Sequence, residues 1–278
     1  MGTPPKPPSA DDLPFDLPRV TRAQRARAAR LGEMLRRSYP DAHCELRYTT
    51  PHELLVATIL SAQSTDAGVN RATPALFERF PTPADYARAT PEEIEPYIRS
   101  LGFFRNKAQA VHRSMTDVVG RFGGEVPRTM GELLTLHGVA RKTANVVLGN
   151  AYGVQAGIPV DTHVERLSVR LGLVKAGTTT QMIERHLMAL FPRETWCDLS
   201  HQIIWHGRRA CKARMACCSG HDICREFGRA CELPRGGKAA PTVTDASETP
   251  TDAAGQAPGP VKQPARKAGA LKRPGRKA

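Results

Sequence analysis

The sequence Leu136-His-Gly-Val-Ala-Arg-Lys142-Thr-Ala-Asn145 predicts a tight turn that opens a helix. Gly138 lets the backbone bend and approach a ligand without a Cβ in the way. The unpaired backbone N–H groups at the start of the following helix can bind a phosphate. Lys142 lies just inside that helix, and a lysine amine becomes a nucleophile once its ammonium form is destabilised. The stretch therefore combines an anion-binding turn with a candidate nucleophile.

A second stretch, Pro159-Val-Asp161-Thr-His163, places a carboxylate at the start of another helix. Aspartate is a preferred N-cap residue, because its side chain accepts hydrogen bonds from first-turn N–H groups. A carboxylate near an amine nucleophile can also stabilise developing positive charge or accept a proton. The two roles are compatible, since the cap fixes the position of the carboxylate. We expect the amine to need a desolvated pocket, because burial lowers a lysine pKa whereas a nearby carboxylate raises it.

Capping signals and apolar periodicity predict an all-α protein with about ten helices. Thr50-Pro-His-Glu53 offers an N-cap threonine, a proline at the first helical position and a glutamate placed for a capping box. The same signals recur at Thr90-Pro-Glu-Glu93 and, without the proline, at Thr129-Met-Gly-Glu132. The apolar run from Leu54 to Leu60 predicts a mostly buried helix.

The net charge of +13 and the pI near 9.8 suit a polyanionic partner such as nucleic acid. No apolar run approaches the ~18 residues that a membrane helix needs, and the start of the chain lacks the order of a signal peptide. We therefore expect a cytoplasmic protein with no membrane partner.

Two tails, residues 1–20 and 232–278, are rich in proline and other residues that bury little apolar surface, so we expect both to be disordered. The last part, residues 262–278, contains seven Lys or Arg and no acidic residue. It is either a solvated tail or an additional electrostatic contact with DNA.

Seven cysteines in a reducing compartment argue against a disulfide framework. Two of them, Cys44 and Cys197, stand apart and are expected to be buried thiols. The other five fall within 21 residues and predict a metal or cluster site: Cys211, Cys217, Cys218, Cys224 and Cys231.

The turn around Gly138 resembles the helix–hairpin–helix of the endonuclease III family of DNA glycosylases, whose pattern is Leu-Pro-Gly-Val-Gly-X-Lys-Thr-Ala. His137 replaces the proline of that pattern and Ala140 replaces its second glycine. Because alanine adds a methyl group and resists positive φ, we expect a weaker or shifted phosphate contact there. The resemblance covers roughly residues 21–227, where four more segments match in family order and spacing: Ser61-Ala-Gln-Ser-Thr-Asp66, Gly124-Glu-Val-Pro127, Val160-Asp-Thr-His163 and His206-Gly-Arg208.

The resemblance implies a two-domain all-α fold with a cleft between the domains. One domain is a six-helix barrel over residues 44–154 that contains the helix–hairpin–helix. The other is an iron–sulfur cluster domain that joins residues 21–43 to residues 155–231. Lys142 and Asp161 would face each other across the cleft.

The resemblance also implies base-excision repair by a monomeric bacterial DNA glycosylase and abasic-site lyase, associated with the nucleoid. Its partner is double-stranded DNA that contains damaged bases or abasic sites. Lys142 would attack C1′ of an oxidised pyrimidine nucleotide and form a Schiff base, and β-elimination would then cut the strand. Asp161 would stabilise the positive charge that develops on the sugar.

By the same resemblance, Gln63 and Phe103 would fill the gap that a flipped base leaves in the duplex. For Phe103, and more so for Phe104, a place in the core is the alternative. The residues expected to contact the DNA backbone are Gly138, Ala140, Arg141, Lys212 and Arg214.

Members of the family hold a [4Fe–4S] cluster with four cysteines spaced x6, x2 and x5, and this chain does not reproduce that spacing. The final spacing is kept by Cys218 and Cys224, which favours Cys211, Cys217, Cys218 and Cys224 as the ligands. A rival set replaces Cys217 with Cys231, and zinc is the alternative metal. The role of the cluster would be structural, because it would order the loop that presents Lys212 and Arg214 to phosphates.

Two other functions fit parts of this pattern. The mismatch adenine glycosylase of the same superfamily normally lacks the lysine and carries a glutamate in the helix before Gln63, where this chain has none near Thr58. A non-catalytic DNA-binding paralogue would keep the fold and lose the activity. Such a protein would bind DNA but form no covalent adduct with an abasic site.

Overall fold

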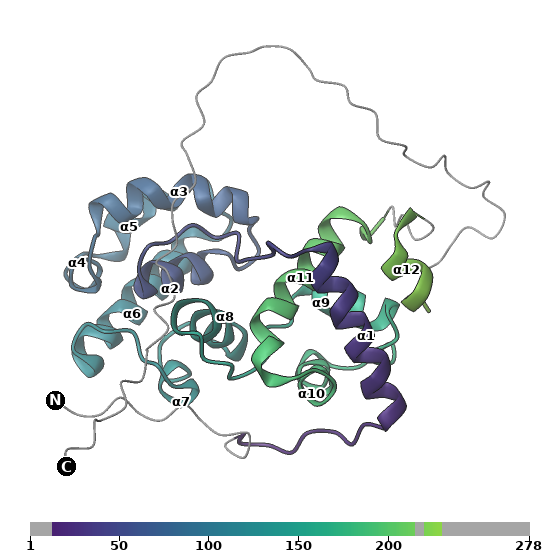
Figure 1. The fold of residues 1–278 in the computed structure, drawn as a ribbon. Helices are drawn as coiled ribbons and strands as arrows, with labels where there is room; N and C mark the ends of the chain where they lie inside the picture. The colour runs from purple at the N-terminus through teal and green to yellow at the C-terminus, as the bar shows by residue number, and fades with distance from the viewer. Residues whose placement is uncertain (1–12, 215–219, 230–278) are drawn as a thin grey trace, which may run out of the picture. The chain divides into compact units, whose positions relative to one another are not determined.

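The computed structural model describes residues 13–214 and 220–229 of the chain. By compactness the chain divides into residues 1–240 and 241–278, and the second unit lies outside the described residues. The described part consists of helices without a strand, which confirms the all-α class. The elements are α1 (Arg22–Ser38), α2 (Pro51–Leu60), α3 (Asp66–Arg79), α4 (Pro83–Arg88), α5 (Pro91–Ile98), α6 (Phe104–Phe122), α7 (Met130–Leu133), α8 (Arg141–Tyr152), α9 (Thr162–Arg170), α10 (Thr180–Leu190), the 3₁₀ helix η2 (Arg193–Thr195), α11 (Trp196–Arg209) and α12 (Asp222–Phe227) (Figure 1).

Helices α2, α5 and α7 begin at the N-cap residues that the sequence predicts. Thr50 caps α2 in a reciprocal capping box with Glu53. In α5 the backbone N–H of Thr90 donates to Glu93 at 2.7 Å, and Thr129 caps the short α7. These contacts satisfy backbone groups that a helix end leaves unpaired, so they fix where each helix starts.

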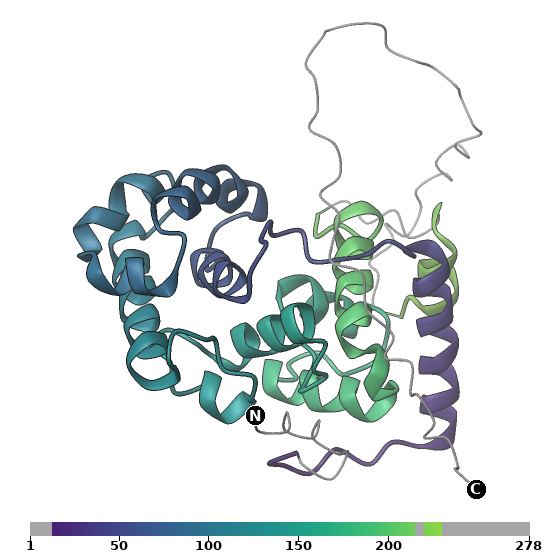
Figure 2. The same cartoon turned by 60° about the vertical axis from the view of Figure 1, so that its left-hand side comes forward.

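One hydrophobic cluster is built around α2, whose residues from Leu54 to Leu60 are all buried. This confirms the buried helix that the apolar run predicts. The helix packs against α3, α6 and α8, and the cluster runs from Leu46 to Leu148 in the chain (Figures 1 and 2). It contains the stacked rings of Phe80 and Tyr86, whose centroids are 5.0 Å apart.

A second hydrophobic cluster joins α1 to the helices that follow residue 158. Helix α1 lies along α11, although the two are far apart in the sequence (Figures 1 and 2). Residues 13–20 were assigned by the sequence to a disordered tail. In the structure four apolar side chains of this segment pack against the second cluster: Leu13, Phe15, Leu17 and Val20. The surface that they contact is formed by residues elsewhere in the chain, so the local composition does not reveal it. The remaining tail predictions, for residues 1–12 and 232–278, lie outside the described residues.

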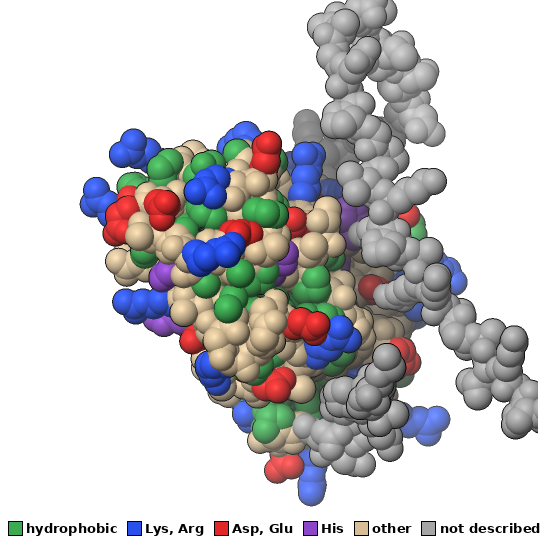
Figure 3. Space-filling model, turned by 90° about the vertical axis from the view of Figure 1, so that its left-hand side faces the viewer, with side chains coloured by type: hydrophobic (Ala, Val, Ile, Leu, Met, Phe, Trp, Pro, Cys, Tyr) green, Lys and Arg blue, Asp and Glu red, His purple; other side chains and the backbone are tan. Residues whose placement is uncertain are grey.

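Over the face formed by the α3–α6 end of the molecule, basic and acidic side chains are interspersed with apolar ones (Figure 3). The net positive charge is therefore not gathered into one patch on that face. None of the helices in the described part is long and apolar enough to cross a membrane.

Candidate active site

The turn between α7 and α8 has the backbone conformation that its glycine predicts. Gly138 adopts φ +74°, and a Cβ at this position would lie 3.2 Å from the Cβ of Ala110 on α6. The N–H of His137 donates to Asp117 at 3.0 Å, which ties the turn to α6. A side chain at Gly138 would therefore meet both an unfavourable φ and a close neighbour.

Ala140 is the N-cap residue of α8 and lies at φ −91°, in extended backbone. The expectation that alanine would resist the required conformation is wrong, because the position does not need a positive φ. No side chain caps this end of α8. The first-turn N–H groups of α8 therefore have no competing side-chain acceptor.

Arg141, a predicted DNA contact, is bound to another part of the protein. Its Nε donates to Glu184 on α10 at 2.8 Å, and its guanidinium lies 4.8 Å from the centre of the Phe15 ring. The buried Glu184 also accepts a hydrogen bond from Asn145 at 2.7 Å. Helix α8 is thus fixed to α10 next to the candidate nucleophile, and contact of Arg141 with DNA stays a prediction.

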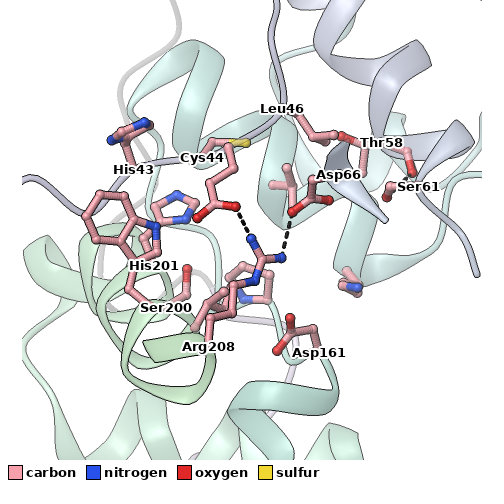
Figure 4. Close-up of a pocket in the computed structure, with 16 residues that line it drawn as sticks. His43, Cys44, Leu46, Thr58, Ser61, Asp66, Asp161, Ser200, His201 and Arg208 are labelled. Carbon is pink, nitrogen blue, oxygen red and sulfur yellow. Dashed lines mark hydrogen bonds and ion pairs between the residues drawn. The ribbon is translucent and has the colours of Figure 1, made fainter. Parts of the chain in front are cut away.

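Lys142 and Asp161 line the same pocket, which has a volume of about 100 Å³. Its walls come from both sequence regions that form the two hydrophobic clusters (Figure 4). Lys142 is the second residue of α8 and is exposed to solvent, so the protein alone does not supply the desolvation expected for the amine. The other lining residues are His43, Cys44, Glu45, Leu46, Thr58, Ser61, Asp66, Val146, Pro159, Ser200, His201, Ile204, Trp205 and Arg208.

Asp161 is the N-cap residue of α9, as the sequence predicts. Its Oδ1 accepts hydrogen bonds from the N–H groups of His163 at 2.9 Å and Val164 at 2.8 Å. Because both cap bonds end on Oδ1, the cap holds the carboxylate without using Oδ2.

Arg208 crosses the pocket from α11 and forms ion pairs with Asp66 at 2.6 Å and with Glu45 (Figure 4). Arg208 and Asp66 fall in sequence segments that the family motifs mark, whereas Glu45 carries no motif. The pair with Asp66 joins α11 to the start of α3, and so it fixes one wall of the pocket against another.

His201 is a second lining residue that no sequence signal marks. It is buried and its Nε2 lies 2.8 Å from Asn150 Oδ1. Burial, with a smaller contribution from the charge of His43, lowers the pKa of His201 to about 4. The ring is therefore neutral at neutral pH.

Gln63 and Phe103, the predicted gap-filling residues, lie at exposed loop positions outside the pocket lining. The Phe103 side chain is 64% exposed, whereas Phe104 packs against the first hydrophobic cluster. Both Gln63 and Phe103 have positive φ, 52° and 58°. The alternative, in which Phe103 belongs to the core, is therefore wrong.

Two of the candidate ligand cysteines, Cys211 and Cys224, are buried and lie next to each other. A hydrogen bond with the Cys224 thiol, joined by one from Arg170, lowers the pKa of Cys211 to about 5 despite its burial. His206 Nε2 lies 3.2 Å from Cys224 Sγ, and the Tyr39 hydroxyl lies 2.9 Å from His206 Nδ1. Donor groups directed at both sulfurs fit thiolate ligands.

The structure describes the residues that flank Cys211 but not the other three candidate ligand cysteines. Cys217, Cys218 and Cys231 lie outside the described residues, and within 13–214 and 220–229 no three potential metal ligands come together. Lys212 and Arg214 are exposed. Arg170 of α9 donates to the carbonyl of Lys212 at 2.8 Å, so the helix that begins after Asp161 also supports the cysteine loop.

The known proteins that this chain is similar to are DNA repair enzymes. Residues 56–193 match the family model for the HhH-GPD superfamily of base excision DNA repair proteins. The chain is 54% identical to endonuclease III of Synechocystis sp. over 196 residues, which span 70% of this chain and 89% of that protein. It is 45% identical to endonuclease III of Bacillus subtilis, over 71% of this chain and 89% of that protein.

Two solved structures agree with these sequence matches. A non-covalent endonuclease III–DNA complex and a trapped covalent intermediate of endonuclease III with DNA each superpose with a TM-score of 0.71 at 42% identity. The superpositions cover 76% of this chain and 96% and 97% of the respective solved chains. This chain therefore belongs to the endonuclease III family and is a base-excision-repair DNA glycosylase and lyase.

Proposed function

We propose that Lys142 is the nucleophile of this enzyme and that Asp161 is its charge partner. The observation that carries the proposal is that both side chains line one pocket, each from the first turn or the N-cap of its own helix. The helix starts fix both groups with respect to the pocket. The amine and the carboxylate would thereby act on the same sugar.

In the reaction the uncharged amine forms a bond to C1′ of the damaged nucleotide, and the bond from C1′ to the base breaks. The base leaves with the electron pair and takes up a proton. The amine nitrogen gives one proton to O4′ as the C1′–O4′ bond breaks, and the sugar ring opens to a protonated Schiff base, which acidifies the C2′ hydrogen. Removal of that hydrogen expels the 3′ phosphate by β-elimination and cuts the strand.

DNA bound over the pocket would supply the desolvation that the free protein lacks. Lys142 is exposed in the structure, and water excluded by a bound duplex disfavours the ammonium form of a lysine. Asp161 would stabilise the positive charge that develops on the sugar and accept a proton through its oxygen outside the cap. The duplex thus completes a site that the protein only prepares.

The substrates we propose are oxidised pyrimidines and abasic sites in double-stranded DNA. A glycosylase must flip its nucleotide out of the stack, and Gln63 and Phe103, which are exposed, would fill the space left behind. The uncapped start of α8 and Gly138 would bind a backbone phosphate, with Ala140 and Arg141 beside it.

We further propose a [4Fe–4S] cluster held by Cys211, Cys217, Cys218 and Cys224, with Cys231 as the rival to Cys217. The buried pair Cys211 and Cys224, which both ligand sets contain, supports a cluster at this place. When bound, the cluster would supply structural order to the loop that carries Lys212 and Arg214, and it would take no part in bond cleavage. These two exposed side chains would then contact phosphates.

The two hydrophobic clusters support a division into a barrel domain over residues 44–154 and a cluster domain that joins residues 21–43 to residues 155–231. We propose that the enzyme acts as a monomer in the bacterial cytoplasm, at the nucleoid. The bacterial relatives of this chain support that location.

Borohydride trapping on duplex DNA with one abasic site tests the central proposal. The wild-type enzyme is expected to form a covalent adduct, because borohydride reduces a Schiff base to a stable amine. Lys142→Ala removes the amine and should form no adduct, whereas Lys175→Ala, at an exposed lysine outside the pocket, should trap like the wild type. A wild-type protein that shifts the DNA in a gel without forming an adduct would instead be a non-catalytic binder.

A further inference from the structure

Two loops in the described part of the chain have an unusual backbone conformation. Among residues 13–214 and 220–229, Gln63 and Phe103 are the non-glycine residues with positive φ. The left-handed region is unfavourable for side chains of this size. Phe103 is also the N-cap residue of α6, and no side chain caps this end of the helix. Something other than local preference must hold both loops in place.

The two loops are joined to each other by a lysine. Lys107 belongs to the first turn of α6, where its N–H donates to the Phe103 carbonyl at 3.0 Å. Its Nζ donates to Ser64 Oγ, next to Gln63, at 2.7 Å. The backbone at Gly68 also lies close to the segment before Phe103, since a Cβ built there would be 3.6 Å from the Leu101 side chain. The loop of Gln63 and the loop of Phe103 therefore share one anchor.

A buried lysine such as Lys107 is energetically unfavourable as a purely structural anchor. The residue is only 5% exposed, and no carboxylate in the described part of the chain forms an ion pair with it. Burial lowers the pKa of Lys107. A buried ammonium with a hydroxyl as its partner is less favourable than an apolar side chain of the same length. Its presence between two exposed, strained loops is explained if it orders those loops for a partner.

We infer that Lys107 is a positioning residue that, through Ser64, holds the Gln63 and Phe103 loops in a single arrangement so that both enter the duplex together. The inference rests on the proposed gap-filling roles of Gln63 and Phe103. It assigns Lys107 no contact with the reacting atoms. Its effect should appear only when a base must be flipped out of a stacked duplex.

The test compares two substrates for each of three variants: Lys107→Met, Ser64→Ala and the double variant. One substrate is a duplex with an oxidised pyrimidine, and the other is a single-stranded oligonucleotide with an abasic site, which needs no gap filling. Each single variant is expected to lower kcat for duplex excision by about 10-fold to 100-fold, as misplaced positioning groups do. The lyase reaction on the single strand should stay within about two-fold of the wild type.

The double variant tells whether the two residues act as one unit. If Lys107 works through Ser64, the double variant should be no slower on the duplex than Lys107→Met alone. Lys107→Arg should recover most of the duplex activity, because a guanidinium can still donate to Ser64. Lys175→Met is the matched control at an exposed lysine and should leave both reactions unchanged.

Three results would overturn the inference: an equal loss on both substrates, an unchanged duplex reaction, or losses that multiply in the double variant. If Lys107→Met does not fold, Ser64→Ala carries the test, because it removes only a hydroxyl from a half-buried residue. Failure of the proposed function would look different. In that case the wild-type enzyme would form no borohydride adduct, or Lys142→Ala would still form it, whatever the Lys107 variants do.

Discussion

Asp161 is the N-cap residue of α9 and the proposed charge partner of Lys142, and each role can be removed separately. The cap bonds to His163 and Val164 need an acceptor oxygen, whereas charge stabilisation needs a carboxylate. Asparagine keeps the acceptor and loses the charge. Alanine loses both.

We expect Asp161→Asn to stay as stable as the wild type, within about 0.5 kcal/mol in the free energy of unfolding, and Asp161→Ala to lose about 1 kcal/mol. Both variants should excise an oxidised pyrimidine roughly 100-fold more slowly, because both lack the negative charge. Urea denaturation and single-turnover excision measure the two effects. An Asp161→Asn enzyme with wild-type turnover would reduce Asp161 to a cap.

His201 should make stability depend on pH. Its pKa in the folded protein is about 4, below the ordinary histidine value of 6.5, because the ring is buried. As the pH falls below 6.5, His201 becomes protonated in the unfolded chain but stays neutral in the folded protein. The stability contribution is therefore complete above pH 6.5 and is lost progressively as the pH falls towards 4, with a total of roughly 3 kcal/mol.

The measurement is urea denaturation at pH 7.5 and pH 5.0 for the wild type and His201→Gln. Glutamine can still donate to Asn150 but does not titrate, so the variant should lose less stability between the two pH values than the wild type. Equal losses in the two proteins would mean that His201 does not resist protonation in the folded state.

At the scale of elements, the segment before α1 reaches α8, the helix that carries Lys142. The Phe15 ring lies 4.8 Å from the Arg141 guanidinium and 4.3 Å from that of Arg185. Arg141 is in turn paired with Glu184. Phe15 thus helps to hold α8 and α10 together beside the residue that precedes Lys142.

Phe15→Ala is expected to lower the free energy of unfolding by about 1–2 kcal/mol, through lost apolar burial and lost contacts with two guanidinium groups. Phe103→Ala is a matched control, because its ring is exposed, and it should change stability by less than about 0.5 kcal/mol. Chemical denaturation at neutral pH measures both. A Phe15→Ala protein as stable as the control would show that the contact with α8 is unimportant for folding.

For the whole molecule, the features that could be predicted from the sequence are those that depend on neighbours a few residues away. The caps at Thr50 and Asp161 and the turn at Gly138 involve residues within one helical turn, so their spacing alone reveals them. The family motifs added the pairing of Lys142 with Asp161 in one pocket.

What the sequence could not reveal depends on partners far along the chain. Glu184 is 43 residues from Arg141, and Glu45 is 163 residues from Arg208, so no local pattern indicates either pair. The packing of Phe15 is hidden for the same reason. The positive φ of Gln63 could not be predicted either, because glutamine has no preference for the left-handed region.

The dispersed origin of the pocket walls has a consequence for biosynthesis. The lining residues are drawn from chain positions 43 through 208, and Arg208 bridges two of those walls. A nascent chain that has left the ribosome only as far as α8 would already display its lysine but would lack α9 and α11 around it. Translation must therefore pass position 208 before damaged DNA meets a finished catalyst, and no proteolytic fragment that ends earlier can replace the intact chain.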